Sequence, residues 1–587
     1  MFPNGAFPER LKAAHMSLIP RGPHQGKVLV WDQDPIIGEP PTGPTNPPTL
    51  WTYQAYSIVD PSPTIPSGSV RFRNYLLPIG PAQPGPIING VQTFQGGDIF
   101  CSGHCWSIFG DLVVVGGTVF RTDPAGGYTY LAADTTFVFS PTEPSTNYAG
   151  DFGRWFQGPQ LDNPRWYPTA TLTGPIPHLG GRHAIAVLGG DSVVGGSPAQ
   201  QHTWNSYEAM DVVKAADPLT APQSGIQTDS FTSTSGASTT WPGPGTHSGG
   251  HPYIPSQPAL DSFQFYPRTH LLTNGRLFMS GFVPFSSNLD HETTTWSPVP
   301  GHAFVPSNWN QLREYGASVR YPNIGGEVDL VLRLGGDDFS SFGPITTNTV
   351  ESCNARDSSS DWKPMEPMKY PRSVFNVVVL PDASLLAIGG RVMLTSTTSA
   401  HEFKPEIYRP GSTSWEDLPM PFSARDYHSA AILLPDGRVL VGGGDDRIDD
   451  RTGGTNGTDY EVFLPPYLVT GGGAIPIRPE NIAFAASVPT EDQGRVTVLT
   501  HGANFTVTLN ALPLGTSIER VVLMAPGSTT HHSDMHQRYH ALVTKHLQPT
   551  SVQFTTPLNA TVLPAGYYML YLVTNTGIPS VARWIRL

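Results

Sequence analysis

The sequence predicts an all-β protein in which a seven-bladed β-propeller is followed by a smaller immunoglobulin-like β-sandwich. A short apolar run that ends in Gly-Gly or a looser variant recurs seven times, and helical periodicity of useful length is missing. The 587 residues also exceed one compact core. With 61 glycines and 60 prolines, the chain is far above the roughly 12% share of these residues in an average protein. This composition indicates an ordered protein that is dense in turns.

The repeated runs define the predicted blades. They read VLVWD (28–32), VVVGG (113–117), AVLGG (186–190), LFMSG (277–281), LRLGG (332–336), LAIGG (386–390) and VLVGG (439–443). The last three glycine pairs begin at Gly335, Gly389 and Gly442, close to the period of roughly 50 residues in kelch propellers. Earlier runs are further apart, so we expect inserted loops in those blades.

Two shifts in composition divide the chain. A stretch at 218–258 is rich in Ser, Thr, Gly and Pro and is interpreted as a long surface insertion within the propeller. The domain boundary is expected near the glycines at 471–473. We therefore predict a propeller over 1–470 and a sandwich over 476–587, where runs such as RVTVLT, RVVLM and YYMLYLV are typical of strands.

Charge and hydropathy argue against several partners. The formal net charge is -13 and no run of Lys and Arg stands out, so nucleic acid is not expected. No apolar run approaches the ~18 residues of a membrane span, and the first residues lack a secretory signal pattern, so any export signal is expected to be absent or removed. Three cysteines do not predict a disulfide framework. The chain is expected to act as a monomer.

Four short segments carry residues suited to chemistry. The first is Asp426-Tyr427-His428-Ser429, directly before the strand of the seventh repeat. Neighbouring strand residues point to opposite faces, so Tyr427 and His428 could reach one metal only where a bend leads into the strand. The alternative is that Tyr427 packs in the core and His428 binds a carbonyl.

The other three segments have equally plain alternatives. Three histidines crowd the stretch 530–538, where imidazoles could bind copper, nickel or zinc, or could lie in solvent. Cys101 precedes the second repeat and could be a small buried apolar residue. Arg165-Trp166-Tyr167 opens the third repeat and could be aromatic core.

Taken in this order, the four segments resemble the copper radical oxidases, the family of galactose oxidase and glyoxal oxidase, from the first repeat to the C-terminus. The resemblance implies a thioether bond between Cys101 and Tyr167, and one copper ion bound by Tyr167, Tyr427, His428 and His531. His531 is the matching histidine because Thr530 precedes it and a Gln-Arg pair follows at the family's spacing. No role is implied for His532, His536, Cys105 or Cys353.

The implied chemistry is a two-electron oxidation of a small molecule by O2, and no organic cofactor is required. Two imidazoles and two phenolate oxygens in a tetragonal arrangement suit Cu(II). The resemblance implies that Tyr427 takes a proton from the substrate, that oxidised Tyr167 removes a hydrogen from carbon, and that O2 becomes hydrogen peroxide. It also implies an extracellular protein.

The choice of substrate depends on two aromatic positions. Galactose oxidase has a tryptophan just after the glycine pair of the third blade, where this chain has Asp191, whereas Trp166 matches the Arg-Trp-Tyr pattern of glyoxal oxidases. We therefore expect oxidation of small aldehydes, as their hydrates, to carboxylic acids. The alternatives are a primary alcohol oxidase of the galactose oxidase type and, in another class, a non-catalytic kelch binding scaffold.

Overall fold

Antiparallel β-strands make up nearly all of the regular structure in the computed structural model of the chain. The structure describes residues 11–38, 51–61, 71–122, 128–190, 207–214, 224–227, 266–298, 313–393, 399–444 and 459–587, apart from short gaps within these ranges. Over these residues it contains 3₁₀ turns but no α-helix, and no helix that could span a membrane. The predicted all-β class is confirmed.

Each of the seven apolar runs falls on the second strand of its own antiparallel sheet. In sequence order the strands of these sheets are β1 (His15–Leu18), β2 (Val28–Gly38), β3 (Trp51–Asp60), β4 (Arg71–Pro81); β7 (Gly103–Trp106), β8 (Leu112–Val115), β11 (Thr136–Pro144), β12 (Phe152–Gln157); β13 (Thr169–Leu172), β14 (Ala184–Leu188), β15 (Tyr207–Lys214), β16 (Ser224–Gln227); β17 (Thr269–Leu271), β18 (Leu277–Met279), β19 (Ser287–Asp290), β20 (Thr295–Pro298); β21 (Ala317–Arg320), β22 (Leu330–Leu334), β25 (Val350–Asn354), β26 (Lys363–Met365); β27 (Asn376–Val379), β28 (Leu385–Ile388), β31 (Glu406–Tyr408), β32 (Trp415–Asp417); β33 (Ser429–Leu433), β34 (Val439–Gly443) and β35 (Tyr460–Phe463).

The first strands of these sheets lie next to one another, as the inner strands of a propeller do. β7 lies beside β13, β13 beside β17, β21 beside β27, β27 beside β33, and β33 beside β1. Most of them are buried along their whole length, which explains why apolar and small residues fill them without alternation. The count of seven blades remains a prediction that this arrangement supports.

Glycine pairs end the second strands because neighbouring backbone comes very close there. Gly335 and Gly389 have φ of 56° and 76°, a region that glycine adopts without strain. A Cβ at Gly335 would lie 2.4 Å from the carbonyl oxygen of Arg372, and one at Gly389 would lie 2.2 Å from that of Arg425. Both arginines lead into the next sheet, so the glycine pair allows successive sheets to pack closely.

The described residues also form three further sheets. Their strands are β5 (Gln83–Ile88), β6 (Val91–Asp98), β9 (Thr118–Thr122) and β10 (Tyr128–Ala132) in one sheet, with the hairpins β23 (Asp337–Ser340) to β24 (Gly343–Thr346) and β29 (Arg391–Met393) to β30 (Ser399–His401). The sequence did not predict the four-stranded sheet. The insertion expected at 218–258 lies outside the described residues, apart from β16.

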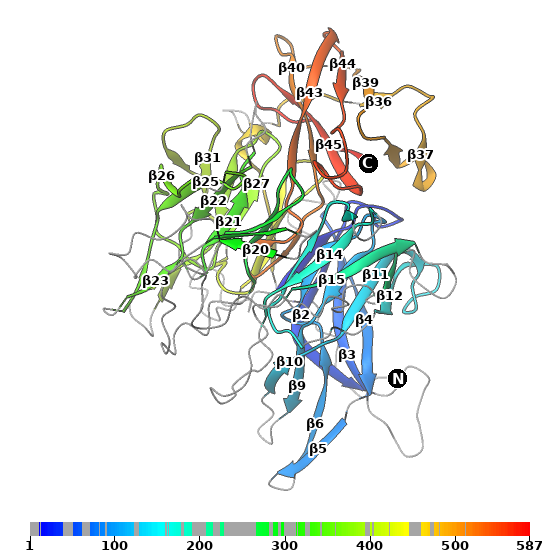
Figure 1. Ribbon diagram of the computed structural model, residues 1–587, viewed down its shortest axis with the longest axis vertical. Coiled ribbons are helices and arrows are strands. Elements are labelled where there is room, and N and C mark those ends of the chain that lie inside the picture. Colours follow the sequence, from blue (N-terminus) through cyan, green and yellow to red (C-terminus); the bar gives the residue numbers. More distant parts are fainter. Residues whose placement is uncertain are drawn as a thin grey trace.

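The C-terminal part forms the predicted sandwich, at the upper end of the molecule in Figure 1. Its strands are β36 (Ala483–Phe484), β37 (Thr490–Glu491), β38 (Val496–Val498), β39 (Asn504–Thr508), β40 (Ile518–Met524), β43 (Tyr539–Gln548), β44 (Ser551–Thr555), β45 (Tyr567–Thr574) and β46 (Arg583–Arg586), with 3₁₀ turns η4 (Pro466–Leu468) and η5 (Asp492–Gly494). The long strand β43 pairs first with β40 and then with β44, and so joins the two layers. The boundaries 1–470 and 476–587 remain predictions.

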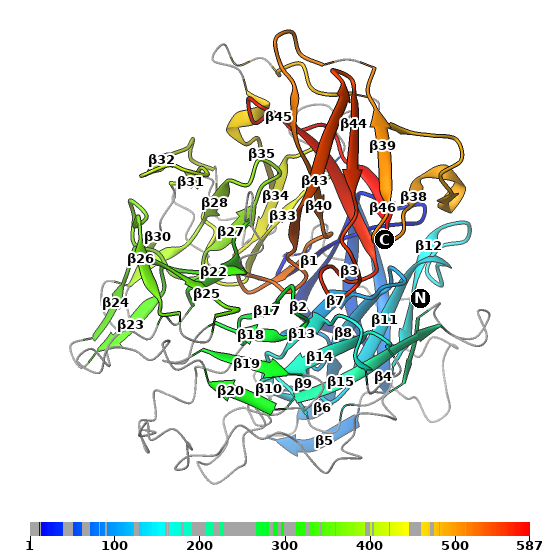
Figure 2. The ribbon, with the colours of Figure 1, turned by 45° about the horizontal axis from the view of Figure 1, so that its top comes forward.

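One hairpin of the C-terminal part leaves the sandwich and enters the N-terminal sheets. Strand β41 (Ser528–Thr530) pairs with β1, where His15 lies opposite Thr530, and with β42 (Ser533–Asp534). It also lies beside β7 and β33. In Figure 2 the green sheets and the cyan and blue sheets flank the lower ends of the orange sandwich strands. The hairpin therefore brings C-terminal side chains to the starts of the inner strands.

Candidate functional site

The starts of the inner strands share an unusual backbone conformation. Cys101, Tyr167, Tyr266, Tyr315 and His428 all have positive φ, between 52° and 63°. Each lies one to three residues before the inner strand of its sheet. This conformation is strained for residues other than glycine, costs roughly 1–3 kcal/mol, and clusters at functional sites. The backbone therefore bends before the strand that follows His428, which is the condition for Tyr427 and His428 to face one site.

Backbone hydrogen bonds join neighbouring strand starts. The Tyr167 N–H donates to the Cys101 carbonyl at 3.0 Å, and the Tyr266 N–H donates to the Tyr167 carbonyl at 2.7 Å. The Val374 N–H donates to the Tyr315 carbonyl at 2.9 Å in the same way. These bonds compensate for the strained backbone and fix the side chains of successive sheets relative to one another.

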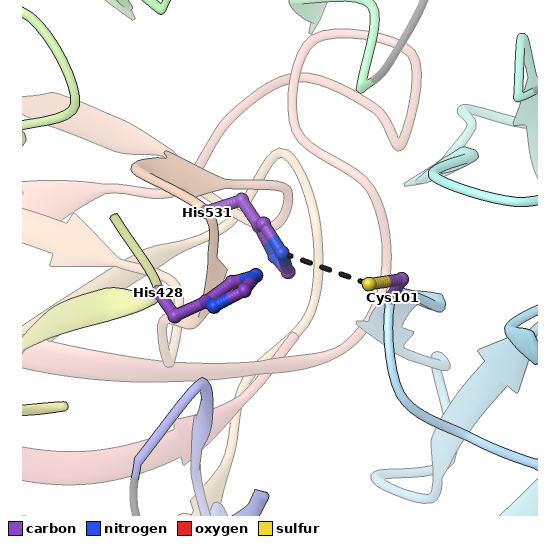
Figure 3. Close-up of side chains that lie close together, drawn as sticks. All are labelled: Cys101, His428 and His531. Atoms are coloured by element: carbon purple, nitrogen blue, oxygen red, sulfur yellow. Dashed lines mark hydrogen bonds between the residues drawn. The ribbon is translucent and has the colours of Figure 1, made fainter. Parts of the chain in front are cut away.

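The predicted residues from distant parts of the chain meet at these strand starts. The Sγ of Cys101 lies 3.8 Å from Nε2 of His531, and the candidate ligand atoms of Cys101, His428 and His531 all lie within 4.8 Å of one another (Figure 3). The phenol oxygens of Tyr167 and Tyr427 are 2.9 Å apart. The rings of Tyr167 and Tyr427 lie 5.0 and 5.4 Å from that of His531.

His531 is held with one nitrogen available. Thr530 Oγ1 donates its only proton to the carbonyl oxygen of Ala14 at 2.9 Å, because a carbonyl can only accept. The 2.7 Å contact between Thr530 Oγ1 and His531 Nδ1 therefore requires the imidazole to donate from Nδ1. Burial, followed by nearby histidines, lowers the pKa of His531 well below its usual range. The neutral ring thus presents an Nε2 lone pair to the site.

Tyr167 is buried beside a sulfur atom. Burial, the Cys101 thiol and Tyr427 all raise its pKa well above the usual range, so the metal-free protein holds it as a neutral phenol. The ring of Trp166 lies 4.4 Å from that of Tyr167, tilted by 45°. Trp166 and Tyr427 are partly exposed, whereas Cys101, Tyr167, His428 and His531 are buried. The site therefore opens on the side of Tyr427 and Trp166.

The donor set fits a divalent transition metal. Two imidazoles and two phenol oxygens converge at one place, and the Cys101 thiol lies beside them. Among the divalent first-row metals, N and O donors of this kind have their highest affinity for copper. The hydrogen bond at Nδ1 of His531 is the outer-shell contact that metal-binding histidines usually make.

The histidines and cysteines for which the sequence implied no role are all buried. His532 Nε2 contacts the carbonyl oxygen of Asp426 at 3.1 Å, and His536 Nδ1 contacts Arg538 at 3.2 Å. Cys105 and Cys353 are buried, and burial raises the pKa of each thiol to about 12. Asp191 lies outside the described residues.

Two further tyrosines at the site, Tyr266 and Tyr315, were not predicted from the sequence. The ring of Tyr266 lies 5.0 Å from that of Tyr167 and 4.7 Å from that of His531, and the ring of Tyr315 lies 5.7 Å from that of Tyr427. An arginine two residues earlier could have marked Tyr315, because Arg165, Arg313, Arg372 and Arg425 recur at this place. Each donates to a carbonyl of the glycine pair that ends the second strand of its own sheet.

Comparison with known proteins identifies two matching families. Residues 331–467 match the family described as glyoxal oxidase N-terminus, and residues 488–587 match the galactose oxidase-like early set domain. Galactose oxidase of Gibberella zeae is 33% identical over 37% of this chain and 29% of its own length. The aldehyde oxidase GLOX of Vitis pseudoreticulata is 29% identical over 55% of this chain and 62% of its own. The chain thus spans less than two thirds of these curated relatives.

One solved structure has the same overall fold. A fungal alcohol oxidase in complex with copper covers 98% of this chain with a TM-score of 0.62 and 18% sequence identity, and the chain covers 97% of that protein. The resemblance to copper radical oxidases that the motifs predicted is confirmed by these matches.

Proposed function

We propose that this protein is a copper radical oxidase that oxidises small aldehydes, as their hydrates, to carboxylic acids and reduces O2 to hydrogen peroxide. The observation that carries the proposal is the meeting of Cys101, Tyr167, Tyr427, His428 and His531 at one buried site. A non-catalytic scaffold would have no use for a strained, buried cluster of this composition. An extracellular location and a monomeric state remain predictions.

In the proposed site Tyr167, Tyr427, His428 and His531 hold one copper ion, and Cys101 forms a thioether with the Tyr167 ring. Copper, when bound, supplies the one-electron couple that complements oxidation of Tyr167 and passes electrons to O2. The partly exposed Tyr427 is suited to take the proton of a substrate hydroxyl at its phenolate oxygen. The Tyr167 oxygen, 2.9 Å away, is suited to take hydrogen from the adjacent carbon.

The reaction balances without another cofactor. A hydrated aldehyde, R–CH(OH)2, loses two hydrogens to become R–COOH, and O2 gains both to become H2O2. Primary alcohols lose the same two hydrogens, so an alcohol oxidase is the second candidate. The relatives include both galactose oxidase and aldehyde oxidases.

Formation of the thioether tests the proposal before any substrate is chosen. We expect the metal-free protein, once given copper and then air, to lose two hydrogens in intact mass, because the Cys101 S–H and a Tyr167 ring C–H are replaced by one S–C bond. Cys105→Ser should undergo the same loss, whereas Cys101→Ser should not. Recovery of unmodified peptides containing Cys101 and Tyr167 from active, copper-loaded protein would contradict the proposal.

A further inference from the structure

A buried chain of histidines and serines starts at the backbone of Cys101. It contains His15 and Ser17 on β1, His104 on β7 and Ser528 on β41, and each of the four residues is 0% exposed. These four side chains thus link the N-terminal strand, the segment that carries Cys101 and the hairpin that carries His531. None of the four belongs to the proposed metal ligands.

The donor and acceptor of the first hydrogen bond, between Cys101 and His15, fix the donors and acceptors of the next two. The Cys101 N–H can only donate, so His15 accepts at Nε2, 3.2 Å away. A neutral imidazole then has its proton on Nδ1, which donates to Nε2 of His104 at 3.1 Å. By the same argument, His104 donates from Nδ1 to Ser528 Oγ at 2.6 Å. The Oγ atoms of Ser528 and Ser17 are 2.9 Å apart.

Both imidazoles are neutral, as this pattern requires. Burial lowers the pKa of His104 to about 3, and burial followed by His104 and His428 lowers that of His15 well below the usual range. The ring of His15 also stacks on Trp31, with centroids 4.7 Å apart and planes 9° apart. Trp31 Nε1 donates to the carbonyl oxygen of Ile99 at 3.2 Å. Trp31 and His15 therefore hold the segment 99–101 by two hydrogen bonds, one to the Ile99 carbonyl and one from the Cys101 N–H.

The backbone of Cys101 in this segment is strained. Its φ of 58° lies in the left-handed region, which a residue with a Cβ adopts only when its surroundings hold it there. Relaxation of this residue would turn the thiol away from the Tyr167 ring. Its N–H bond to His15 opposes that relaxation.

We propose that His15, oriented by His104 and Trp31, is a positioning residue that holds Cys101 for thioether formation. The inference rests on the proposed function. In the reaction the Cys101 S–H and a Tyr167 ring C–H break, one S–C bond forms, and the two electrons and two protons reduce O2 to H2O2. His15 itself is not oxidised or consumed.

The test compares His15→Gln with His15→Met, because the two side chains have nearly the same shape but only the amide can accept from Cys101 N–H and donate to His104. The proteins are prepared without metal, given copper and air, and sampled over time for intact mass and for copper content. We expect both variants to bind copper, His15→Gln to cross-link near the wild-type rate, and His15→Met to be at least about tenfold slower. His183→Met removes another buried histidine, which bonds the Thr173 carbonyl at 2.9 Å, and should cross-link normally.

Equal cross-linking rates in His15→Gln and His15→Met would overturn the positioning role while leaving the proposed function standing. A slow rate in His183→Met equal to that of His15→Met would also overturn it, since general loosening of the core would then explain both. If His15→Met does not fold, His104→Met takes its place, with the same expected slowing. A wild-type chain that binds copper and never cross-links would overturn the proposed function together with this inference.

Discussion

His531 is oriented by its neighbour in the chain. Thr530 Oγ1 donates to the Ala14 carbonyl and accepts from His531 Nδ1, so the ring can turn only by breaking a buried hydrogen bond. His532 faces the other way and contacts the Asp426 carbonyl. Two adjacent histidines therefore have different expected functions, and this difference can be measured.

We expect His531→Gln to lose tight copper binding and His532→Gln to keep it. The first variant removes a proposed ligand, so copper affinity should fall by more than the roughly 10–100-fold that is typical of changes outside the ligand set. Copper content after dialysis, together with competitive titration, measures both effects. Unchanged copper in His531→Gln would contradict the proposed ligand set.

Thr530→Val should weaken copper binding less than His531→Gln does. The variant keeps the shape of the side chain but leaves Nδ1 of His531 without its acceptor, so affinity should fall by about 10–100-fold. The same titration measures it. A wild-type affinity in Thr530→Val would show that the hydrogen bond does not orient the ring in the holo protein.

The residues that meet at the site could be predicted from the sequence, but the contacts that hold them in place could not. Tyr427, His428 and His531 could be selected because they lie in short local patterns. The bond between Cys101 and His15 joins positions 86 residues apart, and no local pattern records such a contact. The same holds for Tyr266, which has no arginine two residues before it.

At the level of elements, the seven apolar runs predicted the second strands of seven sheets, because most of those strands are short, apolar and followed by a glycine turn. The pairing of β41 with β1 was beyond sequence reasoning, since Ser528 and Ser17 are 511 residues apart. The sheets are also tied to one another by polar contacts outside the site, and Asp151 is the clearest of these.

Asp151 links the sheet of β11 and β12 to β4. Its carboxylate accepts from Tyr75 at 2.7 Å and from Arg73 at 2.5 Å, and it contacts His24 at 2.7 Å. Burial raises the pKa of Asp151, but the hydrogen bonds outweigh burial and hold it well below the usual range. The folded state therefore favours the ionised form, and this stabilisation is present above about pH 4 and is lost as the pH falls further.

We expect Asp151→Asn to lower the free energy of unfolding by about 1–3 kcal/mol at pH 7, and to have a smaller effect near pH 3, where protonation weakens the wild type as well. Urea unfolding at both values measures this. Asp417→Asn, which alters an exposed carboxylate paired with Lys369, is the control and should have less effect. An equal loss at pH 7 and pH 3 would mean that charge at Asp151 is not responsible.

At the scale of the whole molecule, the all-β class and the C-terminal sandwich could be predicted, because strands and turns have strong local signals. The entry of the hairpin 528–534 among the inner strands could not, since it reflects packing of the two parts. Substrate choice also belongs to this scale, because segments from several sheets surround the site.

We expect small aldehydes to be oxidised with a higher kcat/KM than galactose. A sugar requires an apolar face and matched polar groups, and the aromatic ring that covers Tyr167 here is Trp166, its direct neighbour. Peroxide-coupled kinetics on fully cross-linked protein would compare glyoxal, methylglyoxal, glycolaldehyde, benzyl alcohol and galactose. A highest value for galactose or benzyl alcohol would replace the aldehyde assignment with the alcohol oxidase.

The pairing of β41 with β1 has a consequence for biosynthesis. Chains emerge from the ribosome N-terminus first, and domains generally fold in that order. When His428 has emerged, β1 and Cys101 are already present, but Ser528, Thr530 and His531 have yet to be translated. A nascent propeller therefore lacks one imidazole of the site and a neighbour for β1. With the proposed ligand set, metal loading and thioether formation are therefore expected only after translation has passed the hairpin, so an unfinished chain would lack the complete site.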